Sequence, residues 1–177
     1  TSWTAGQGAA SPVIIDLDSP TDLATHNVFS FTHVGGTSFG FKCQRAGDVL
    51  DTPGGDSTPT DDLLIQQNSG FGLVYLHPGR PVVTGGVTLD LSTPSGSCPG
   101  TSGCTDEDAR RVVLAQDLSG SASGSEASGF GSSMAGKSDL SGDGIADIAI
   151  ANSGRTSTDG RDLWIFDGVK IAASAGG

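Results

Sequence analysis

The sequence predicts an all-β protein built from two repeated units of four short strands each. Two observations support this prediction. Gly contributes 28 and Pro 8 of the 177 residues, and both residue types interrupt helices and favour turns between strands. In addition, the same order of strand-forming and turn-forming segments occurs twice along the chain. Repeats of this kind indicate a fold in which neighbouring units cover each other's apolar faces.

The repeat is clearest around two phenylalanines. Phe39 and Phe130 each precede a glycine, and an aspartate stands nine positions after each of them, at Asp48 and Asp139. An apolar strand follows each aspartate-rich stretch, and the next strand then ends near a glycine. The two phenylalanines are 91 positions apart, so each unit has the length of a small four-stranded sheet with its loops.

The repeat divides the chain into segments. Four short strands in a repeated unit are typical of β-propeller blades, and rings of this type close with about 4–8 blades. We therefore expect this two-bladed chain to be completed by further blades or by oligomerisation. The segments are a lead of residues 1–11, a first blade of residues 12–80, a second blade of residues 81–169 and a polar tail of residues 170–177.

Stretches rich in Val, Ile, Phe, Thr and Leu, bounded by Gly, Pro, Asp or Ser, mark the expected strands. Only residues 105–116 contain a helix-like stretch, and their apolar end is better suited to a strand. The four expected strands of the first unit lie near residues 13–17, 28–34, 39–46 together with 62–66, and 72–76, and those of the second lie near 87–91, 112–114, 148–150 and 163–166.

The chain is strongly acidic, and its acids are almost all aspartate. The formal net charge is −11, and of 20 acidic residues only Glu107 and Glu126 are glutamate. The short aspartate side chain suits turns and loops that hold hard cations. The negative charge disfavours nucleic acid and anionic membranes as partners. No apolar run approaches the roughly 20 residues of a membrane span, so no membrane insertion is expected.

The sharpest motif is the loop of residues 139–147. Side-chain oxygens occupy loop positions 1, 3, 5 and 9, a backbone carbonyl is available at position 7, and a glycine at position 6 permits a left-handed turn. This pattern predicts a Ca²⁺ site, although the bidentate glutamate of an EF-hand is missing at position 12. The predicted ligands are Asp139, Ser141, Asp143, Ile145 and Asp147.

The corresponding loop of the first unit, residues 48–62, is longer. Asp48 and Asp62 bracket it as the expected first and last ligands, with Asp56 as the middle ligand and Asp51 as an alternative. This loop is expected to bind a second Ca²⁺ in an altered geometry or not at all. In both loops the alternative is that the aspartates cap turns without any ion.

These motifs resemble the FG-GAP repeat, a family that includes integrin-alpha-type propeller blades and bacterial extracellular repeat proteins. In the second unit Phe-Gly precedes Asp-x-Ser-x-Asp-Gly-x-x-Asp, an apolar triplet and a strand that ends in Trp-Ile-Phe-Asp-Gly. The resemblance covers nearly the whole chain, although the first unit departs from it in its loop. It implies calcium as the usual ion and an extracellular β-propeller.

The cysteines favour an extracellular location. Cys98 and Cys104 lie in a short Gly- and Pro-containing loop that would close a disulfide, and no further Cys or His nearby completes a zinc site. Cys43 is expected to be a buried thiol in a strand, with an inter-chain bridge as the alternative. The chain begins at Thr1, which suggests a processed product or an excised piece.

No catalytic constellation is evident, so we expect a protein that is not an enzyme. The three histidines share no metal spacing, and the nucleophile-elbow letters at residues 36–40 fall between two expected strands rather than before a helix. The expected function is that of a non-catalytic extracellular calcium-binding structural or adhesive module. Its expected partners are further copies or blades, and a protein or glycan ligand.

Two alternatives remain open. A carbohydrate-binding module would use Trp3, Tyr75 or Trp164 as a sugar-stacking platform, although core packing is favoured for Trp164. The chain could also be a non-catalytic fragment of a propeller-bearing hydrolase.

Overall fold

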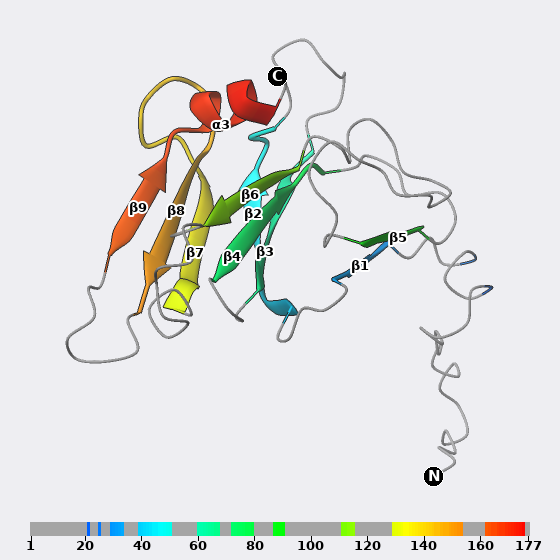
Figure 1. Ribbon diagram of the computed structural model, residues 1–177. Helices are drawn as coiled ribbons and strands as arrows, with labels where there is room; N and C mark the ends of the chain where they lie inside the picture. Colours follow the sequence, from blue (N-terminus) through cyan, green and yellow to red (C-terminus); the bar gives the residue numbers. More distant parts are fainter. Residues whose placement is uncertain are drawn as a thin grey trace, which may run out of the picture.

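The computed structural model shows a mostly β chain that ends in a short helix (Figure 1). It describes residues 21, 25, 29–33, 39–50, 60–67, 72–79, 87–90, 111–115, 129–153 and 162–175. The expected strand at residues 13–17 and the helix-like stretch before residue 111 lie outside these residues.

Two antiparallel sheets form the body of the described structure. The first sheet has the strand order β2-β3-β4-β6 and the second has the order β7-β8-β9. The strands of the first sheet are β2 (Phe39–Gly47), β3 (Asp62–Gln67), β4 (Leu73–His77) and β6 (Val112–Ala115). Those of the second are β7 (Phe130–Ser138), β8 (Asp147–Asn152) and β9 (Leu163–Phe166).

The internal repeat is present in the register of the strands. Ile65 pairs with Tyr75 across β3 and β4, and at the equivalent place Ile150 pairs with Trp164 across β8 and β9. Both β2 and β7 shift register twice, once after their phenylalanine and once before their last residue. The same pairing and the same irregularities therefore recur in both sheets.

The two sheets pack face to face over one apolar core (Figure 1). The side-chain amide of Gln66 in the first sheet donates to the backbone carbonyl of Phe130 in the second, at 2.7 Å. The Phe130 ring meets Trp164 edge-on, with ring centroids 5.4 Å apart. The buried residues of this core are Ala46, Val49, Leu50, Leu64, Val74, Leu76, Leu114, Phe130, Ile148, Ile150 and Ile171.

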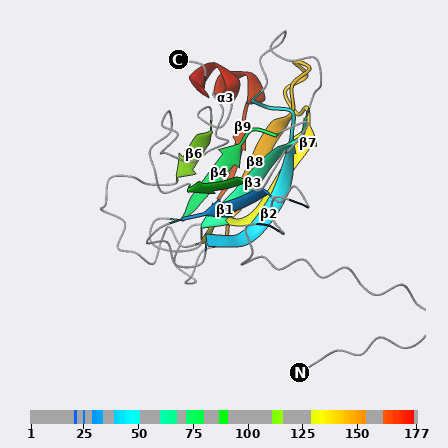
Figure 2. The same ribbon diagram turned by 90° about the vertical axis from the view of Figure 1, so that its right-hand side faces the viewer.

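A separate pair of parallel strands, β1 (Phe29–Thr32) and β5 (Val87–Asp90), lies across the other face of the first sheet (Figure 2). Phe31 meets the His77 ring at a centroid distance of 4.8 Å, and His33 lies 5.8 Å from the Tyr75 ring. This second, smaller cluster covers the face of the first sheet that points away from the second sheet.

Strands β2 and β7 run close together along a seam between the two sheets. A Cβ placed on Gly136 would lie 2.5 Å from the Cα and the carbonyl oxygen of Ala46, so only a glycine fits there. Asp61 accepts ion pairs from both strands, from Arg45 of β2 and from Lys137 of β7, the latter at 3.1 Å. The seam thus combines close backbone packing with a shared carboxylate.

Several expectations need correction. Cys43 lies in a strand, as expected, but it is exposed rather than buried. Residues 170–175 of the segment expected as a polar tail belong to helix α3 (Gly168–Ala175), whose Ile171 and Ala172 are buried. Strand β6 belongs to the second unit by sequence, yet it pairs with β4 of the first. The sequence units and the sheets therefore do not coincide.

We predict that Gly136→Ala lowers the free energy of unfolding by about 1–3 kcal/mol, because the added methyl group overpacks the seam. Ser133→Ala, on an exposed position of the same strand, should change it by less than about 0.5 kcal/mol. Urea denaturation of the two variants measures both values. Equal midpoints for the two variants would show that the seam tolerates a side chain.

Candidate functional site

The first residue of β3 ties together three parts of the first unit. Asp62 Oδ2 accepts the backbone N–H groups of Val49 and Leu50 at 2.8 and 2.7 Å, and its Oδ1 accepts the N–H of Gly79 at 2.8 Å. The carboxylate is 1% exposed. It thus joins the loop before β3 to the turn that follows β4, an arrangement called here an aspartate clamp.

The same clamp recurs in the second unit. Asp147, the first residue of β8, accepts the N–H groups of Leu140 and Ser141 on Oδ2, at 2.7 and 2.8 Å. Its Oδ1 accepts the N–H of Gly168 at 2.9 Å. Each clamp donor in this unit occupies the position equivalent to its counterpart in the first unit. Gly168, for example, lies two residues after β9, just as Gly79 lies two residues after β4. The repeat of the sequence is therefore also a repeat of hydrogen bonds.

The clamps bear on the predicted metal ligands. The sequence predicts Asp62 and Asp147 as the last ligands of their loops, whereas in the structure all four carboxylate oxygens accept backbone N–H groups. In each carboxylate Oδ2 accepts two N–H groups and Oδ1 accepts one, so only Oδ1 keeps a second lone pair, and ligation by these residues stays a prediction. From the sequence, the glycines after β4 and β9 are expected only as strand ends, and their role as clamp donors is not predicted.

Asp139 organises the rest of the 139–147 loop. Its Oδ1 accepts the N–H groups of Gly142 and Asp143 at 2.6 and 3.1 Å, and its Oδ2 accepts the N–H of Gly144 at 2.8 Å. The hydroxyl of Ser141 lies 3.4 Å from the same Oδ1. Gly142 and Gly144 have φ angles of 82° and 93°, which residues with a side chain rarely adopt. The loop therefore wraps around the Asp139 carboxylate.

The remaining predicted ligands lie on the exposed side of this loop. Asp143 is exposed, and its Oδ1 accepts the N–H of Ile145 at 2.9 Å. Carboxylate, hydroxyl and backbone carbonyl oxygens form a donor set that suits Ca²⁺. Within the described ranges, however, no three acidic, histidine or cysteine side chains gather closely enough to hold a metal ion by themselves. The donor chemistry fits calcium, while the side chains are engaged mainly with backbone N–H groups.

Hydrogen bonding keeps two carboxylates of this loop ionised. The N–H of Gly168 is the main cause that lowers the pKa of Asp147 below its usual value. The N–H of Gly144 does the same for the pKa of Asp139. Negative charge is therefore held in the loop where a cation is predicted to bind.

In the first-unit loop, the pKa of the clamp aspartate is shifted in the opposite direction. Burial raises the pKa of Asp62 despite its three clamp hydrogen bonds, and the negative charge of Asp48 adds to the rise. Asp48 itself is half-buried, and its Oδ1 is buried with no hydrogen-bond partner. Asp51 and Asp56, the predicted middle ligands, and the predicted disulfide Cys98–Cys104 lie outside the described residues.

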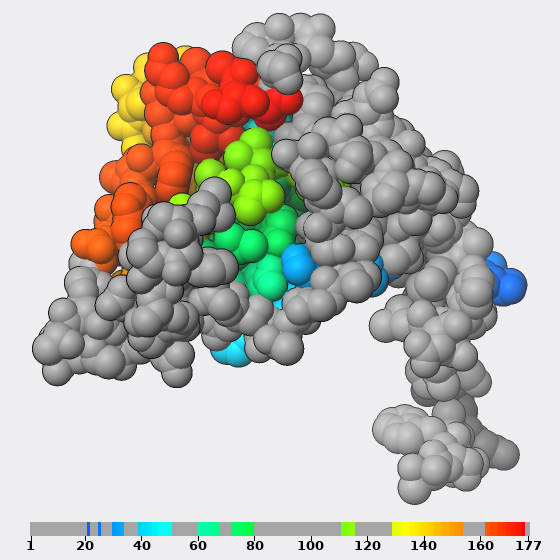
Figure 3. Space-filling view, in the orientation of Figure 1, coloured from blue at the N-terminus to red at the C-terminus, as the bar shows by residue number. Residues whose placement is uncertain are grey.

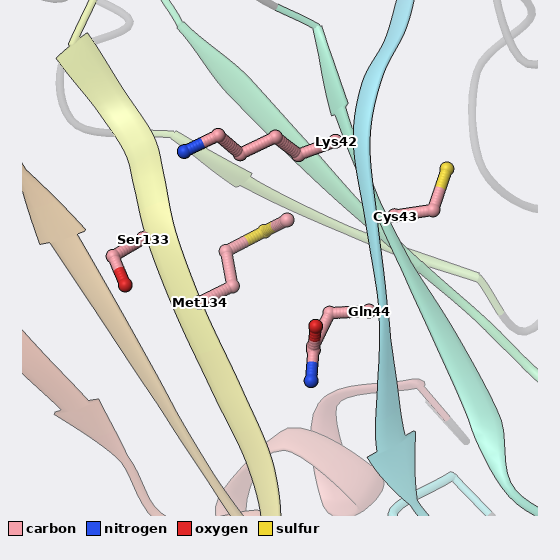
Figure 4. Close-up of a pocket in the computed structure, with 5 residues that line it drawn as sticks. All are labelled: Lys42, Cys43, Gln44, Ser133 and Met134. Atoms are coloured by element: carbon pink, nitrogen blue, oxygen red, sulfur yellow. The ribbon is translucent and has the colours of Figure 1, made fainter.

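A hollow of about 260 Å³ lies between β2 and β7 (Figure 4). Lys42 and Gln44 extend from β2 toward β7, and the Lys42 ammonium group donates to the carbonyl of Ser132. Cys43 points away from β7, so its thiol does not face Met134 across the hollow. Partial burial raises the pKa of the Cys43 thiol, which keeps it protonated. This hollow offers no arrangement of reactive groups.

Of the aromatic residues considered as sugar platforms, Tyr75 is buried and Trp164 is half-buried. Tyr75 is 3% exposed and its hydroxyl donates to Gln67 Oε1 at 2.9 Å. Trp164 packs against Phe130 in the shared core. Trp3 lies outside the described residues. Both described side chains are engaged in packing contacts with their neighbours.

Comparison with protein-family models, curated proteins and solved structures found no significant match. Among the described helices, none is long and apolar enough to cross a membrane.

We predict that Asp62→Asn lowers the free energy of unfolding by about 2 kcal/mol, because the new amide turns an NH₂ group toward buried N–H donors. Asp162→Asn, an exposed aspartate before β9, serves as the control and should be nearly neutral. Urea denaturation compares the two. A neutral Asp62→Asn would show that the first clamp does not hold its loop.

The opposite pKa shifts predict opposite pH dependences. The lowered pKa values of Asp139 and Asp147 give stability that is present above about pH 4 and is lost as the pH falls through their folded-state values. The raised pKa of Asp62 costs stability as the pH rises above about 4.

Urea midpoints measured from acidic to neutral pH in EGTA test this. Asp147→Asn should flatten the acid-side loss, and Asp62→Asn should remove the loss on raising the pH. The readout is the slope of the urea midpoint against pH, because each substitution also changes the midpoint at every pH. Parallel pH profiles for wild type and both variants would contradict the assignment.

Proposed function

We propose that this protein is a non-catalytic, extracellular, calcium-binding structural or adhesive module of two FG-GAP-like units. The observation that carries the proposal is the aspartate clamp repeated at Asp62 and Asp147. It shows the same supporting bonds built twice, as expected in a scaffold of stacked units rather than around a single catalytic cleft. On this proposal the units are propeller blades, completed by further blades or copies.

Calcium binding is assigned to the loop of residues 139–147. Asp139, Ser141 and Asp143 would supply side-chain oxygens and Ile145 its backbone carbonyl, while Asp147 holds the loop in its curled form. Bound Ca²⁺ would offset the mutual repulsion of the loop carboxylates and part of the net charge of −11. The chain's own residues prepare this loop, because the Asp139 and Asp147 hydrogen bonds fold it already.

The two alternatives have less support. Tyr75 and Trp164 are packed against other residues, which weakens the case for a sugar-stacking platform. The clamp carboxylates are engaged with backbone N–H groups and are poorly placed to act as general bases in a hydrolase fragment.

Saturating Ca²⁺ is predicted to raise the melting temperature by about 5–10 °C relative to EGTA, because the ion binds the folded loop and not the unfolded chain. Differential scanning calorimetry with CaCl₂, MgCl₂ and EGTA measures the shift. Magnesium should have a smaller effect, since it keeps its waters. An unchanged melting temperature in calcium would contradict the proposal.

A matched pair of variants locates the ion. Asp143→Asn keeps an oxygen that can accept the Ile145 N–H but removes the loop charge, so it should abolish most of the calcium-dependent rise while leaving the melting temperature in EGTA nearly unchanged. Asp167→Asn likewise keeps an acceptor for the Lys170 N–H and removes a carboxylate outside the loop. It should keep the full calcium response. Equal responses of the two variants would place the ion elsewhere.

A further inference from the structure

The second sheet has an uncovered apolar face. Leu163 and Ile165 point away from the core and are 66% and 59% exposed. Their cross-strand partners Ala151 and Ala149 lie on the same face and are half-buried. In Figure 3 β9 (orange) reaches the molecular surface at the left edge. These four residues are called the outer face of the second sheet.

The repeat shows what covers this face in the first unit. The positions equivalent to Ala149, Ala151, Leu163 and Ile165 are Leu64, Gln66, Val74 and Leu76 of the first sheet. All four are buried, and they pack against the second sheet. The outer face therefore has the position and apolar character of a surface that, one unit earlier, forms the contact between the sheets.

The edge of the second sheet at β9 is also unpaired among the described strands. In the first sheet β6 adds antiparallel to β4, with Tyr75 opposite Val113. The equivalent strand β9 has no neighbour beyond it among the described strands. Because β6 belongs by sequence to the second unit, the first sheet takes its fourth strand from the unit that covers it.

Strand β1 is the counterpart of β6, since each is the strand that precedes the phenylalanine strand of its unit. Within one chain no earlier sheet is described for β1 to complete. It instead pairs with β5, and Phe31 lies over His77 on a face of the first sheet. The equivalent face of the second sheet, with Trp164, is the one that packs against the first sheet.

We infer that copies of this chain associate head to tail. The outer face of the second sheet in one copy contacts the first sheet of the next copy, on the face that β1 covers within a single chain. Strand β1 of that next copy leaves its pairing with β5 and adds antiparallel to β9. This inference rests on the proposed scaffold of repeated units. A contact between two different faces is heterologous, so it gives closed rings or open stacks rather than symmetric dimers.

The first test is sedimentation equilibrium of the whole chain over a wide concentration range, in both CaCl₂ and EGTA. Wild type should form species larger than a monomer. Ile165→Lys should weaken association at least about tenfold, since a buried charge and an edge lysine both oppose sheet contacts. Val169→Lys, a change at an exposed apolar residue of helix α3 outside the outer face, should associate like wild type.

The second test distinguishes head-to-tail contact from other modes. Ser30→Pro disables β1, because proline cannot donate to a strand ladder, and it leaves the outer face intact. Ile165→Lys disables the outer face and leaves β1 intact. At concentrations where each variant alone is monomeric, their mixture should form a one-to-one dimer and nothing larger.

The outcomes separate this inference from the proposed function. A monomeric wild type at all concentrations, equal association of Ile165→Lys and Val169→Lys, or a mixture that stays monomeric would each overturn the head-to-tail contact. Association that persists in EGTA, with no calcium-dependent rise in melting temperature, would support the contact while removing calcium from the proposed function. A calcium response in a strictly monomeric protein would do the reverse.

Discussion

The structure depends on two buried carboxylates that each accept three backbone hydrogen bonds. A buried charge is costly unless its lone pairs are satisfied, and each clamp satisfies three of the four lone pairs of its carboxylate with N–H groups that would otherwise be unpaired inside turns. Because each clamp joins a loop, the start of a middle strand and the turn after the next strand, it fixes three segments with one side chain. The equal geometry of the two sheets follows from this shared constraint.

The clamped strands in turn set the packing between the sheets. Once the middle strands are fixed, alternate residues point to opposite faces, so Leu64 and Ile150 meet in one core while Ile65 faces the aromatic cluster under β1. The two faces of a sheet are unlike, and the contact between the sheets joins one kind of face to the other. Because the contact joins two different faces, the described chain leaves one apolar face of its second sheet uncovered.

Much of the local structure could be predicted from the sequence, because it depends on short-range patterns. The strands around Phe39 and Phe130, the apolar strands after the aspartate loops and the left-handed turn at Gly144 follow from residue type and spacing. The pairing of β6 with β4 could not be predicted, since no local pattern names a strand's partner. The exposure of Cys43 depends on what lies over β2, and the burial of Ile171 in α3 depends on the core reaching past the last strand.

The seam between β2 and β7 has a consequence for how this sequence can change over evolutionary time. Gly136 lies against the backbone of Ala46, so a side chain gained there cannot be compensated by a smaller neighbour. Descendants of this chain can exchange most exposed residues freely, but they must keep glycine at this site or reposition a whole strand. A glycine six positions after the Phe-Gly phenylalanine of the second unit is therefore a marker by which diverged relatives can be found when the rest of the sequence has drifted.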